Sequence, residues 1–463
     1  MEKTDPQSKL YDVAIIGGGV VGCAIARKLS HFDLHVCLIE AQSDVGMGTS
    51  KANTAIFHTG FDAVPGSLEA TLLRRSAPLL QEYCGATGIA YQINGALMVA
   101  WNAEQLARLP KIEQDARRNG VTRVEPQSAD QVYRLESHLG PGAMGGLLIH
   151  EEGILCPYSV VLAYAYEARR NGVHFIFNAR VHAIDAHAEG HEVSTTGPQV
   201  RTRWLVNAAG LYSDDVDRCL DHNRFHVTPR KGELLIYDKF ASSLLHHTIL
   251  PIPTEKTKGV LVCPTVYGNV LLGPTAEDIE DKTDTSTSAD GLAGLQVKGK
   301  FILPELVNEE VTATYAGLRA ATEHKDYQIH FDAAGRYACV GGIRSTGLSA
   351  SMGISEYVVE EMQSAGLACA EKAKRESVLV PPLGEHQVRP CRDEKRIGEN
   401  PAYGRIVCHC ERVTLGEVQE ALRADPAPAN LDGLRRRTRC LQGRCQGFYC
   451  QSQIKELLWE HQS

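Results

Sequence analysis

The chain has 463 residues, of which 43% are hydrophobic and 22% charged, with a formal net charge of −8. This length has room for two or three domains. The mild acidity argues against nucleic acid or an anionic membrane as the main partner, and no run of 18 apolar residues predicts a transmembrane helix. Residues 1–10 lack the layout of a signal peptide, and the cysteines before residue 400 are scattered singly. Such cysteines are typical of a reducing cytosol, so we expect a cytoplasmic protein.

A dinucleotide-binding unit is predicted at residues 11–40, where a strand, a helix and a second strand follow one another. The turn after the first strand holds Gly17, Gly19, Val20, Val21 and Gly22. In this G-x-G-x-x-G pattern the glycines permit a tight turn, close approach of a pyrophosphate and helix-on-strand packing. The helix N-terminus would face the phosphates, and Glu40 ends the second strand where an acid accepts a hydrogen bond from a ribose hydroxyl. The alternative is a glycine-rich turn in an unrelated α/β unit.

Three later segments carry small and hydroxyl-bearing residues: GMGTSKANTAIFHTG at 46–60, WLVNAAGLYS at 204–213 and GGIRSTGLSAS at 341–351. Together with the glycine motif, and in this order, they resemble the flavin-contact segments of the D-amino-acid-oxidase/glycerol-3-phosphate-dehydrogenase superfamily. The resemblance implies FAD as the cofactor. It also implies a further set of FAD-binding residues: Ala41, Thr49, Ser50, Asn53, Val181, Ala208, Ala209, Gly210, Gly342, Arg344, Thr346, Gly347 and Leu348.

The flavin fold is expected to be discontinuous. We assign residues 1–87, 150–221 and 334–376 to the FAD-binding domain, and the β-rich residues 88–149 and 222–333 to a substrate domain. Within the latter, Tyr267-Gly268-Asn269 predicts a hairpin turn between two apolar runs. Proline, glycine and mixed charge make residues 377–402 a linker, and residues 403–463 form a small third domain.

The third domain contains five of the 14 cysteines: Cys408, Cys410, Cys440, Cys445 and Cys450. Thiolates that converge from two loops can hold a metal ion or an iron–sulfur cluster. Between the cysteines, Thr414 and Glu417 predict a helix capping box. The C-x-C pair and the segment RTRCLQGRCQGFYC resemble the bacterioferritin-associated-ferredoxin-like [2Fe-2S] domain.

On that resemblance the cluster ligands are Cys408, Cys410, Cys445 and Cys450, and Cys440 is a spare thiol. Two alternatives stay open. Cys440 could be the ligand in place of Cys445, and the site could instead bind zinc through four thiolates or through three thiolates and His409. Nearby basic residues would offset the charge of the cluster or form a solvated face: Arg435, Arg436, Arg437, Arg439 and Arg444. The expected fold is therefore α/β, with a discontinuous Rossmann-like FAD domain, a β-rich substrate domain and a small helical [2Fe-2S] domain.

In this superfamily the flavin takes a hydride from a carbon that bears a hydroxyl or an amine. The resemblance places His58 beside the isoalloxazine as a general base; the alternative is packing against the ring. Arg319, in the YAGLR strand, would bind the substrate anion or fix a sheet edge. Arg344 would bind the substrate anion or a flavin carbonyl, or have a purely structural role. Lys258 and Arg230 are weaker candidates for substrate binding, and for both a structural or surface role is the favoured interpretation.

The layout resembles both the FAD subunit of anaerobic glycerol-3-phosphate dehydrogenases and the L-2-hydroxyglutarate oxidases. We expect an FAD-dependent dehydrogenase of a small anionic alcohol, with sn-glycerol 3-phosphate first and a 2-hydroxy acid second. Electrons would leave through the cluster to an electron-accepting protein or partner subunit, and any membrane association would be peripheral, through that partner. An oxidase is disfavoured because a flavin that reduces oxygen needs no cluster. The alternatives are an amine or imino-acid dehydrogenase subunit and a non-catalytic electron-transfer subunit.

Overall fold

The first sheet forms where the sequence predicts a dinucleotide fold. In the computed structural model, which describes residues 10–253 and 259–462, its parallel strands run in the spatial order β9-β2-β1-β12-β20. Their bounds are β1 (Leu10–Ile16), β2 (Val36–Ile39), β9 (His174–Ile176), β12 (Val200–Asn207) and β20 (Tyr337–Gly341). All four residues of β2 are buried, as expected for a parallel strand covered on both faces. Candidate Lys258 lies outside the described residues.

Antiparallel strands extend this sheet at one side: β10 (Val181–His187) and β11 (Gly190–Thr195) beyond β12, and β19 (Gln328–Asp332) beside β20. Residues 328–332 were assigned to the substrate domain, but they pair with β20 along its whole length, so this strand belongs to the first sheet. The substrate-domain boundary at 333 therefore falls after a strand of the other sheet.

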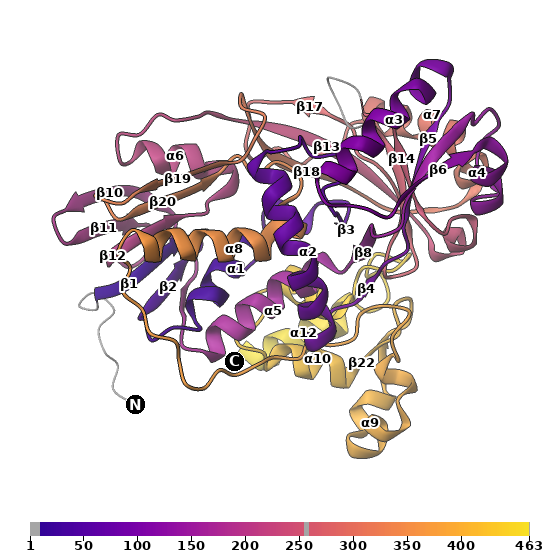
Figure 1. Ribbon diagram of the computed structural model, residues 1–463. Coiled ribbons are helices and arrows are strands. Elements are labelled where there is room, and N and C mark those ends of the chain that lie inside the picture. Colours follow the sequence, from indigo (N-terminus) through magenta and orange to yellow (C-terminus); the bar gives the residue numbers. More distant parts are fainter. Residues whose placement is uncertain (1–9, 254–258, 463) are drawn as a thin grey trace.

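One face of the first sheet is covered by four helices: α1 (Val20–Leu29), α2 (Leu68–Thr87), α5 (Pro157–Arg170) and α8 (Gly347–Ser364). Figure 1 shows α1 and α8 in front of the strands, with α2 and α5 toward the centre of the molecule. They bury a continuous apolar core with the sheet. The opposite face carries a smaller core that includes α6 (Ser213–Arg218).

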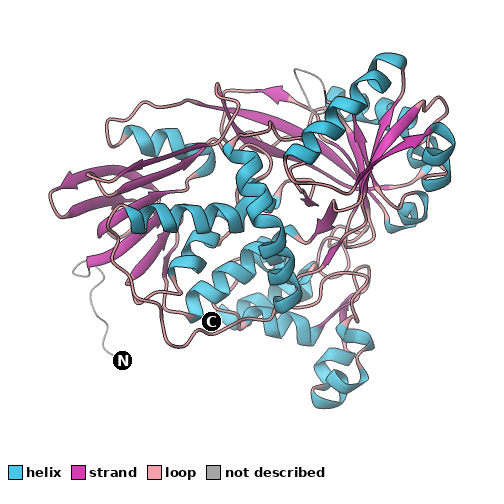
Figure 2. Cartoon of the chain, viewed as in Figure 1, coloured by secondary structure: helices cyan, strands magenta, loops and turns pink. Residues whose placement is uncertain are grey.

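The second sheet occupies the other end of the molecule (Figure 2). Its order is β17-β13-β16-β15-β14-β5-β7-β6, and β18 (Val311–Thr322) pairs with β13. The bounds are β5 (Ala96–Ala100), β6 (Val124–Ser128), β7 (Gly145–Ile149), β13 (Val227–Tyr237), β14 (Thr248–Pro251), β15 (Leu261–Pro264), β16 (Val270–Gly273) and β17 (Glu277–Asp278). The helices beside it are α3 (Ala103–Arg118), α4 (Ala129–Leu135) and α7 (Ala289–Ile302). The predicted hairpin at 267–269 is confirmed, since β15 and β16 are antiparallel.

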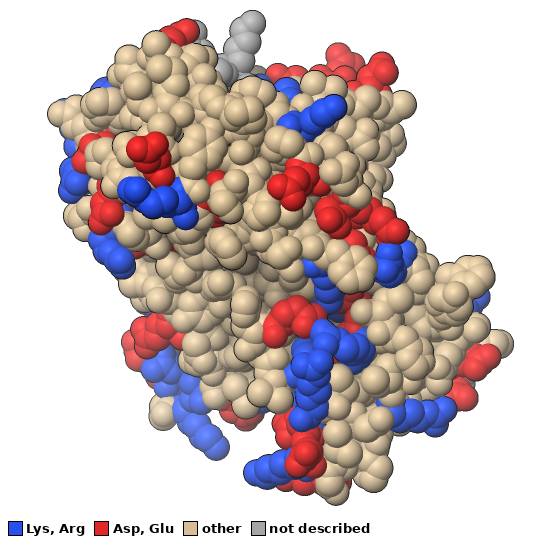
Figure 3. Space-filling view, turned by 90° about the vertical axis from the view of Figure 1, so that its right-hand side faces the viewer, with Lys and Arg blue, Asp and Glu red and all other residues tan. Residues whose placement is uncertain are grey.

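A three-stranded sheet stands between the two large ones, formed by β3 (Ile56–Phe57), β8 (Gly153–Leu155) and β4 (Tyr91–Gln92). On the end of the molecule that holds the second sheet, Figure 3 shows acidic and basic side chains interspersed. That face carries no broad field of one sign. Across the described ranges, no helix is both long and apolar enough to cross a bilayer.

The C-terminal residues form a small helical domain beneath α5 (Figure 1). Its elements are α9 (Glu394–Glu399), β21 (Ile406–Cys408), β22 (Val413–Thr414), α10 (Leu415–Leu422), α11 (Leu431–Thr438) and α12 (Gln451–Gln462). Val413, Val418, Leu434 and Ile454 belong to a core of its own. The predicted capping box at Thr414 and Glu417 is confirmed at the start of α10.

Candidate active site and cysteine centre

The glycine-rich turn after β1 is built so that only glycine fits. Gly17 has φ +107°, and a Cβ there would lie 2.4 Å from the Ala208 carbonyl oxygen. A Cβ on Gly22 would lie 1.9 Å from the Gly17 oxygen. Glu40 orders the turn, because its carboxylate accepts the Gly18 N–H at 2.6 Å and the Gln42 N–H at 2.7 Å. Burial raises the pKa of this carboxyl, so it relies on those amides.

An open cavity of about 1680 Å³, its mouth included, contains the N-termini of two helices. Gly19 and Val20 at the start of α1, and Thr346 and Gly347 at the start of α8, line it. The N-cap residues Gly19 and Thr346 make no side-chain cap bond, and the Val20 N–H donates to Ser50 Oγ at 2.9 Å, so two positive helix ends face the cavity. This arrangement fits an anionic, phosphate-bearing group such as the pyrophosphate of FAD.

The cavity brings together most of the predicted site residues. Its wall includes Gly19, Val20, Val21, Thr49, Ser50, Asn53, His58, Ala208, Gly210, Arg319, Arg344, Thr346, Gly347 and Leu348. The wall does not include Gly17, Gly22, Glu40, Ala41, Val181, Ala209 or Gly342. Gly17, Gly22 and Glu40 instead shape the turn, and Val181 begins β10.

His58 is held between two carboxylates within the cavity. Its Nδ1 lies 2.9 Å from Glu152 Oε1, and its Nε2 lies 2.9 Å from Asp62 Oδ1. Burial opposes the charged ring, but Glu152 and Asp62 outweigh it and raise the pKa of His58 to about 10. The ring is therefore a cation at neutral pH in this arrangement, and it can accept a proton only after releasing one.

Two arginines of the cavity have no carboxylate within ion-pair distance in the described part of the chain. Arg319 is fixed by backbone, donating from Nη2 to the Thr275 oxygen at 2.9 Å. Burial, with Arg230 and Arg344 nearby, lowers the pKa of Arg319 to about 10. Arg230 itself forms a two-point ion pair with Asp278 at 2.6 and 2.8 Å, which favours the structural role expected for it. Arg319 and Arg344 can therefore receive an anion from outside.

Four thiols of the C-terminal domain lie in two pairs. Cys408 interacts directly with Cys450, and Cys410 with Cys445. Burial raises the pKa of Cys408 to about 11, partly offset by the N–H groups of Glu411 and Leu441. For Cys445 burial also raises the pKa, but amides that include those of Tyr449 and Gly447 outweigh it and lower the pKa overall. N–H groups aimed at sulfur are the donors that stabilise a cluster's thiolates.

The donor set of four thiols in two pairs fits a two-iron cluster. Among residues 10–253 and 259–462, no group of three or more His, Cys, Asp or Glu side chains is arranged so that it could hold a metal ion. A Cβ on Gly443 would lie 2.3 Å from the Cys410 Cβ, so this loop can close over the pair only with glycine. Cys440 accepts the Thr438 hydroxyl at 3.0 Å, and burial, with Cys408 and Cys450 nearby, raises its pKa to about 12.

Three of the neighbouring arginines are paired with carboxylates. Arg436 and Arg437 both bind Asp44, a fully buried carboxylate in the loop after β2, at 2.8 and 2.6 Å. Arg444 pairs with Glu310 of the second sheet's domain. Glu310 first, with a smaller contribution from Cys410, raises the pKa of Arg444, so this guanidinium also lies near a thiol of the centre. That these side chains offset the charge of the cluster stays a prediction.

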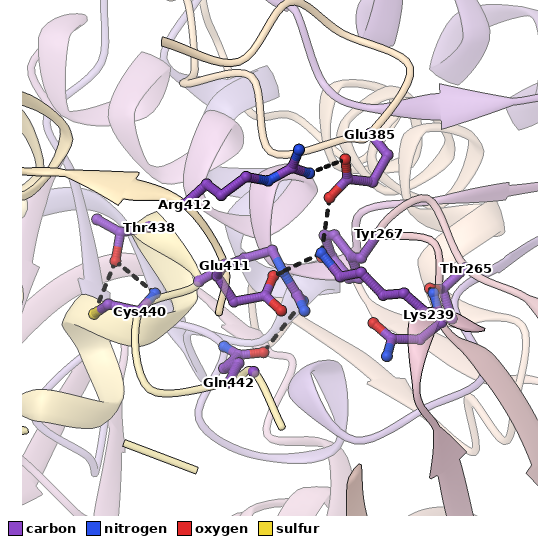
Figure 4. A network of polar contacts seen from close by, with 12 residues as sticks. Lys239, Thr265, Tyr267, Glu385, Glu411, Arg412, Thr438, Cys440 and Gln442 are labelled. Atoms are coloured by element: carbon purple, nitrogen blue, oxygen red, sulfur yellow. Dashed lines mark hydrogen bonds and ion pairs between the residues drawn. The ribbon is translucent and has the colours of Figure 1, made fainter. Parts of the chain in front are cut away.

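A second set of charges, buried at Glu411 and Arg439 and partly exposed at its edge, joins the cysteine domain to the rest of the chain (Figure 4). Glu411, next to Cys410, accepts Arg439 Nε at 2.9 Å and Lys239 Nζ at 3.2 Å. Lys239 also donates to Glu385, which Arg412 binds at 2.5 Å. The Arg439 guanidinium lies 3.7 Å from the centre of the Tyr267 ring. The cysteine domain is thus docked on both large domains.

Three acidic residues of these sites were missed from the sequence: Asp44, Asp62 and Glu152. The only available signal for Glu152 was an acid set between apolar runs, GGLLIHEEGIL. Asp62 stands four residues after His58, and nothing local distinguishes Asp44 from a surface loop acid.

Comparison with known proteins agrees with this geometry. Residues 12–361 match the family described as "FAD dependent oxidoreductase", and residues 406–460 match the "BFD-like [2Fe-2S] binding domain". Glycerol 3-phosphate dehydrogenase of Caloramator mitchellensis is 34% identical over 455 residues, 97% of this chain and 94% of that protein. L-2-hydroxyglutarate dehydrogenase of Homo sapiens is 29% identical over 58% of this chain and 61% of its own. L-alpha-glycerophosphate oxidase from Mycoplasma pneumoniae, solved with FAD bound, superposes with TM-score 0.76 at 28% identity, covering 81% of this chain and 99% of that one.

Proposed function

Since this chain belongs to the FAD-dependent oxidoreductase family and ends in a BFD-like [2Fe-2S] binding domain, we propose that it is a dehydrogenase of sn-glycerol 3-phosphate. FAD and a [2Fe-2S] cluster are its cofactors. A relative that aligns over 97% of this chain is a glycerol 3-phosphate dehydrogenase. The observation that carries the proposal is the pair Arg319 and Arg344, which line the same cavity as His58 without a carboxylate within ion-pair reach among the described residues. Such guanidinium groups suit a phosphate.

Each residue of the cavity has a part in this proposal. The helix starts at Gly19 and Gly347 would hold the cofactor's phosphates and ring. Bound FAD supplies the hydride acceptor. Arg319 and Arg344 would bind the substrate phosphate and so orient the alcohol carbon. The hydroxyl proton would pass to the His58–Asp62 pair, whose Nε2 and Oδ1 lie 2.9 Å apart.

The thiols would carry the electrons out. Cys408, Cys410, Cys445 and Cys450 are the proposed ligands, and Cys445 lies at the surface side of the domain, only partly buried. We propose a protein electron acceptor that meets the cluster there. Oxygen would be a poor physiological acceptor for this chain, because the cluster adds a route that an oxidase does not need.

The test is anaerobic reduction of the purified FAD- and cluster-loaded protein, followed by absorbance and electron paramagnetic resonance. sn-Glycerol 3-phosphate is expected to bleach the flavin and then to reduce the cluster. L-2-hydroxyglutarate is the second candidate, supported by the 29% identical relatives and by the same arginines, which bind carboxylate equally well. Bleaching by L-proline or glycine alone would overturn the proposal in favour of an amine dehydrogenase. Bleaching by none of them would indicate an electron-transfer subunit.

A further inference from the structure

Glu152 is a buried carboxylate that accepts hydrogen bonds from His58 and Thr59. It lies in the turn between β7 and β8 with 1% of its surface exposed. Its Oε1 accepts three hydrogen bonds: from His58 Nδ1 at 2.9 Å, from the Thr59 N–H at 2.6 Å and from the Thr59 hydroxyl at 2.6 Å. His58 is its only cationic partner in the described part of the chain. A buried carboxylate needs such a partner, because an unpaired buried charge is strongly destabilising.

The groups around His58 come from three segments. Glu152 faces Nδ1, and Asp62 faces Nε2 from the turn after β3. Phe61 meets the ring edge-on at 5.5 Å, and Ser349 of α8 accepts the His58 backbone N–H at 2.8 Å. The ring therefore has one fixed orientation, in which Nδ1 turns toward the protein interior and Nε2 toward Asp62 and the cavity.

We propose that Glu152 is a positioning residue for the reaction, which locks His58 through Nδ1 so that Nε2 is the nitrogen presented to the substrate hydroxyl. This inference rests on the proposed function of the cavity. Glu152 exchanges no proton with the substrate; the hydroxyl proton goes to the His58–Asp62 pair. The carboxylate has two effects: it fixes the ring, and its charge increases the proton affinity of the ring.

The first test needs no substrate. In FAD-loaded protein labelled with ¹⁵N-histidine, the His58 resonance is assigned by its loss in His58→Gln and titrated with pH. Glu152→Gln keeps an oxygen acceptor but removes the charge, so the titration midpoint is expected to fall by about 1–3 units. Thr59→Val is the matched control: it removes one hydrogen bond to the same Oε1 and leaves the charge, so the midpoint should stay nearly unchanged. An unchanged midpoint in folded Glu152→Gln would overturn the proposal.

Turnover separates positioning from mere stability. Glu152→Gln is expected to lower the rate of flavin reduction at least tenfold with less than a threefold change in KM, and to move the rise of rate with pH to lower pH. Glu152→Asp, which keeps the charge, should restore the pH profile, and it is the variant to use if Glu152→Gln does not fold. A pH profile that is identical in all three proteins would refute the role. If sn-glycerol 3-phosphate reduces no form but the His58 midpoint still shifts, the proposed substrate fails while the placement of the ring stands.

Discussion

Asp44 is expected to contribute more than any surface ion pair to the docking of the cysteine domain. The carboxylate is fully buried and takes hydrogen bonds from two guanidinium groups, at 2.8 Å from Arg436 and at 2.6 and 3.0 Å from Arg437. Those arginine side chains are 4% and 2% exposed. Asp44→Ala leaves Arg437 buried without its carboxylate and Arg436 with only Asp432, 3.4 Å from its Nε, which costs about 3–5 kcal/mol. At about 1.4 kcal/mol per factor of ten, α11 should open more than 100-fold more often.

Amide hydrogen exchange across α11 measures that opening directly. The matched control is Asp425→Ala, which breaks a pair between the same two domains, Arg169–Asp425, whose side chains are 37% and 68% exposed. Its effect should lie within about 0–1 kcal/mol. Adding Arg437→Met to Asp44→Ala should recover part of the loss, because it removes one stranded charge. If α11 exchanges at the same rate in Asp44→Ala and Asp425→Ala, the argument from burial is wrong.

Three further outcomes are expected. Cys445→Ser should abolish the visible absorption of the cluster while FAD stays bound, and Cys440→Ser should change neither; a cluster lost only from the second variant would reassign the ligand. Arg319→Ala should raise KM for the anionic substrate by about 10- to 150-fold, since a charge-assisted contact is worth roughly 1.5–3 kcal/mol. Arg230→Ala is its control, because its guanidinium is already paired with Asp278, and equal kinetics in both variants would remove Arg319 from the pocket. Gly22→Ala should yield no FAD-loaded protein, because the added Cβ would lie 1.9 Å from the Gly17 oxygen; normal flavin content would refute this.

Local patterns predicted most of the elements. The glycine turn, the hairpin at 267–269 and the capping box at Thr414 each depend on residues a few positions apart, so the sequence contains the whole signal. The comparisons confirm the α/β flavoprotein fold, the two cofactors and the link to glycerol 3-phosphate enzymes. The roles of individual site residues stay predictions.

Long-range pairs could not be predicted in this way. Asp44 meets Arg437 across 393 positions of sequence, and Glu152 meets His58 across 94. A buried carboxylate and a surface carboxylate look the same in sequence, because burial is decided by which distant segment packs over it. The same holds for β19, whose pairing with β20 decides the sheet to which it belongs.

The docking of the cysteine domain also bears on how this enzyme can be dissected. The loop between β2 and the cavity leans on that domain through Asp44, through the Val45 oxygen, which accepts Arg436, and through Lys51, which binds Asp432. Cutting the chain after residue 402 would remove all of these partners and leave the loop beside the glycine turn without them. If the truncated protein lost FAD, the cause would be the altered loop and not the missing route for electrons. Replacing a single cysteine ligand leaves these contacts in place. Such variants are therefore the better way to separate oxidation of the alcohol from electron transfer through the cluster.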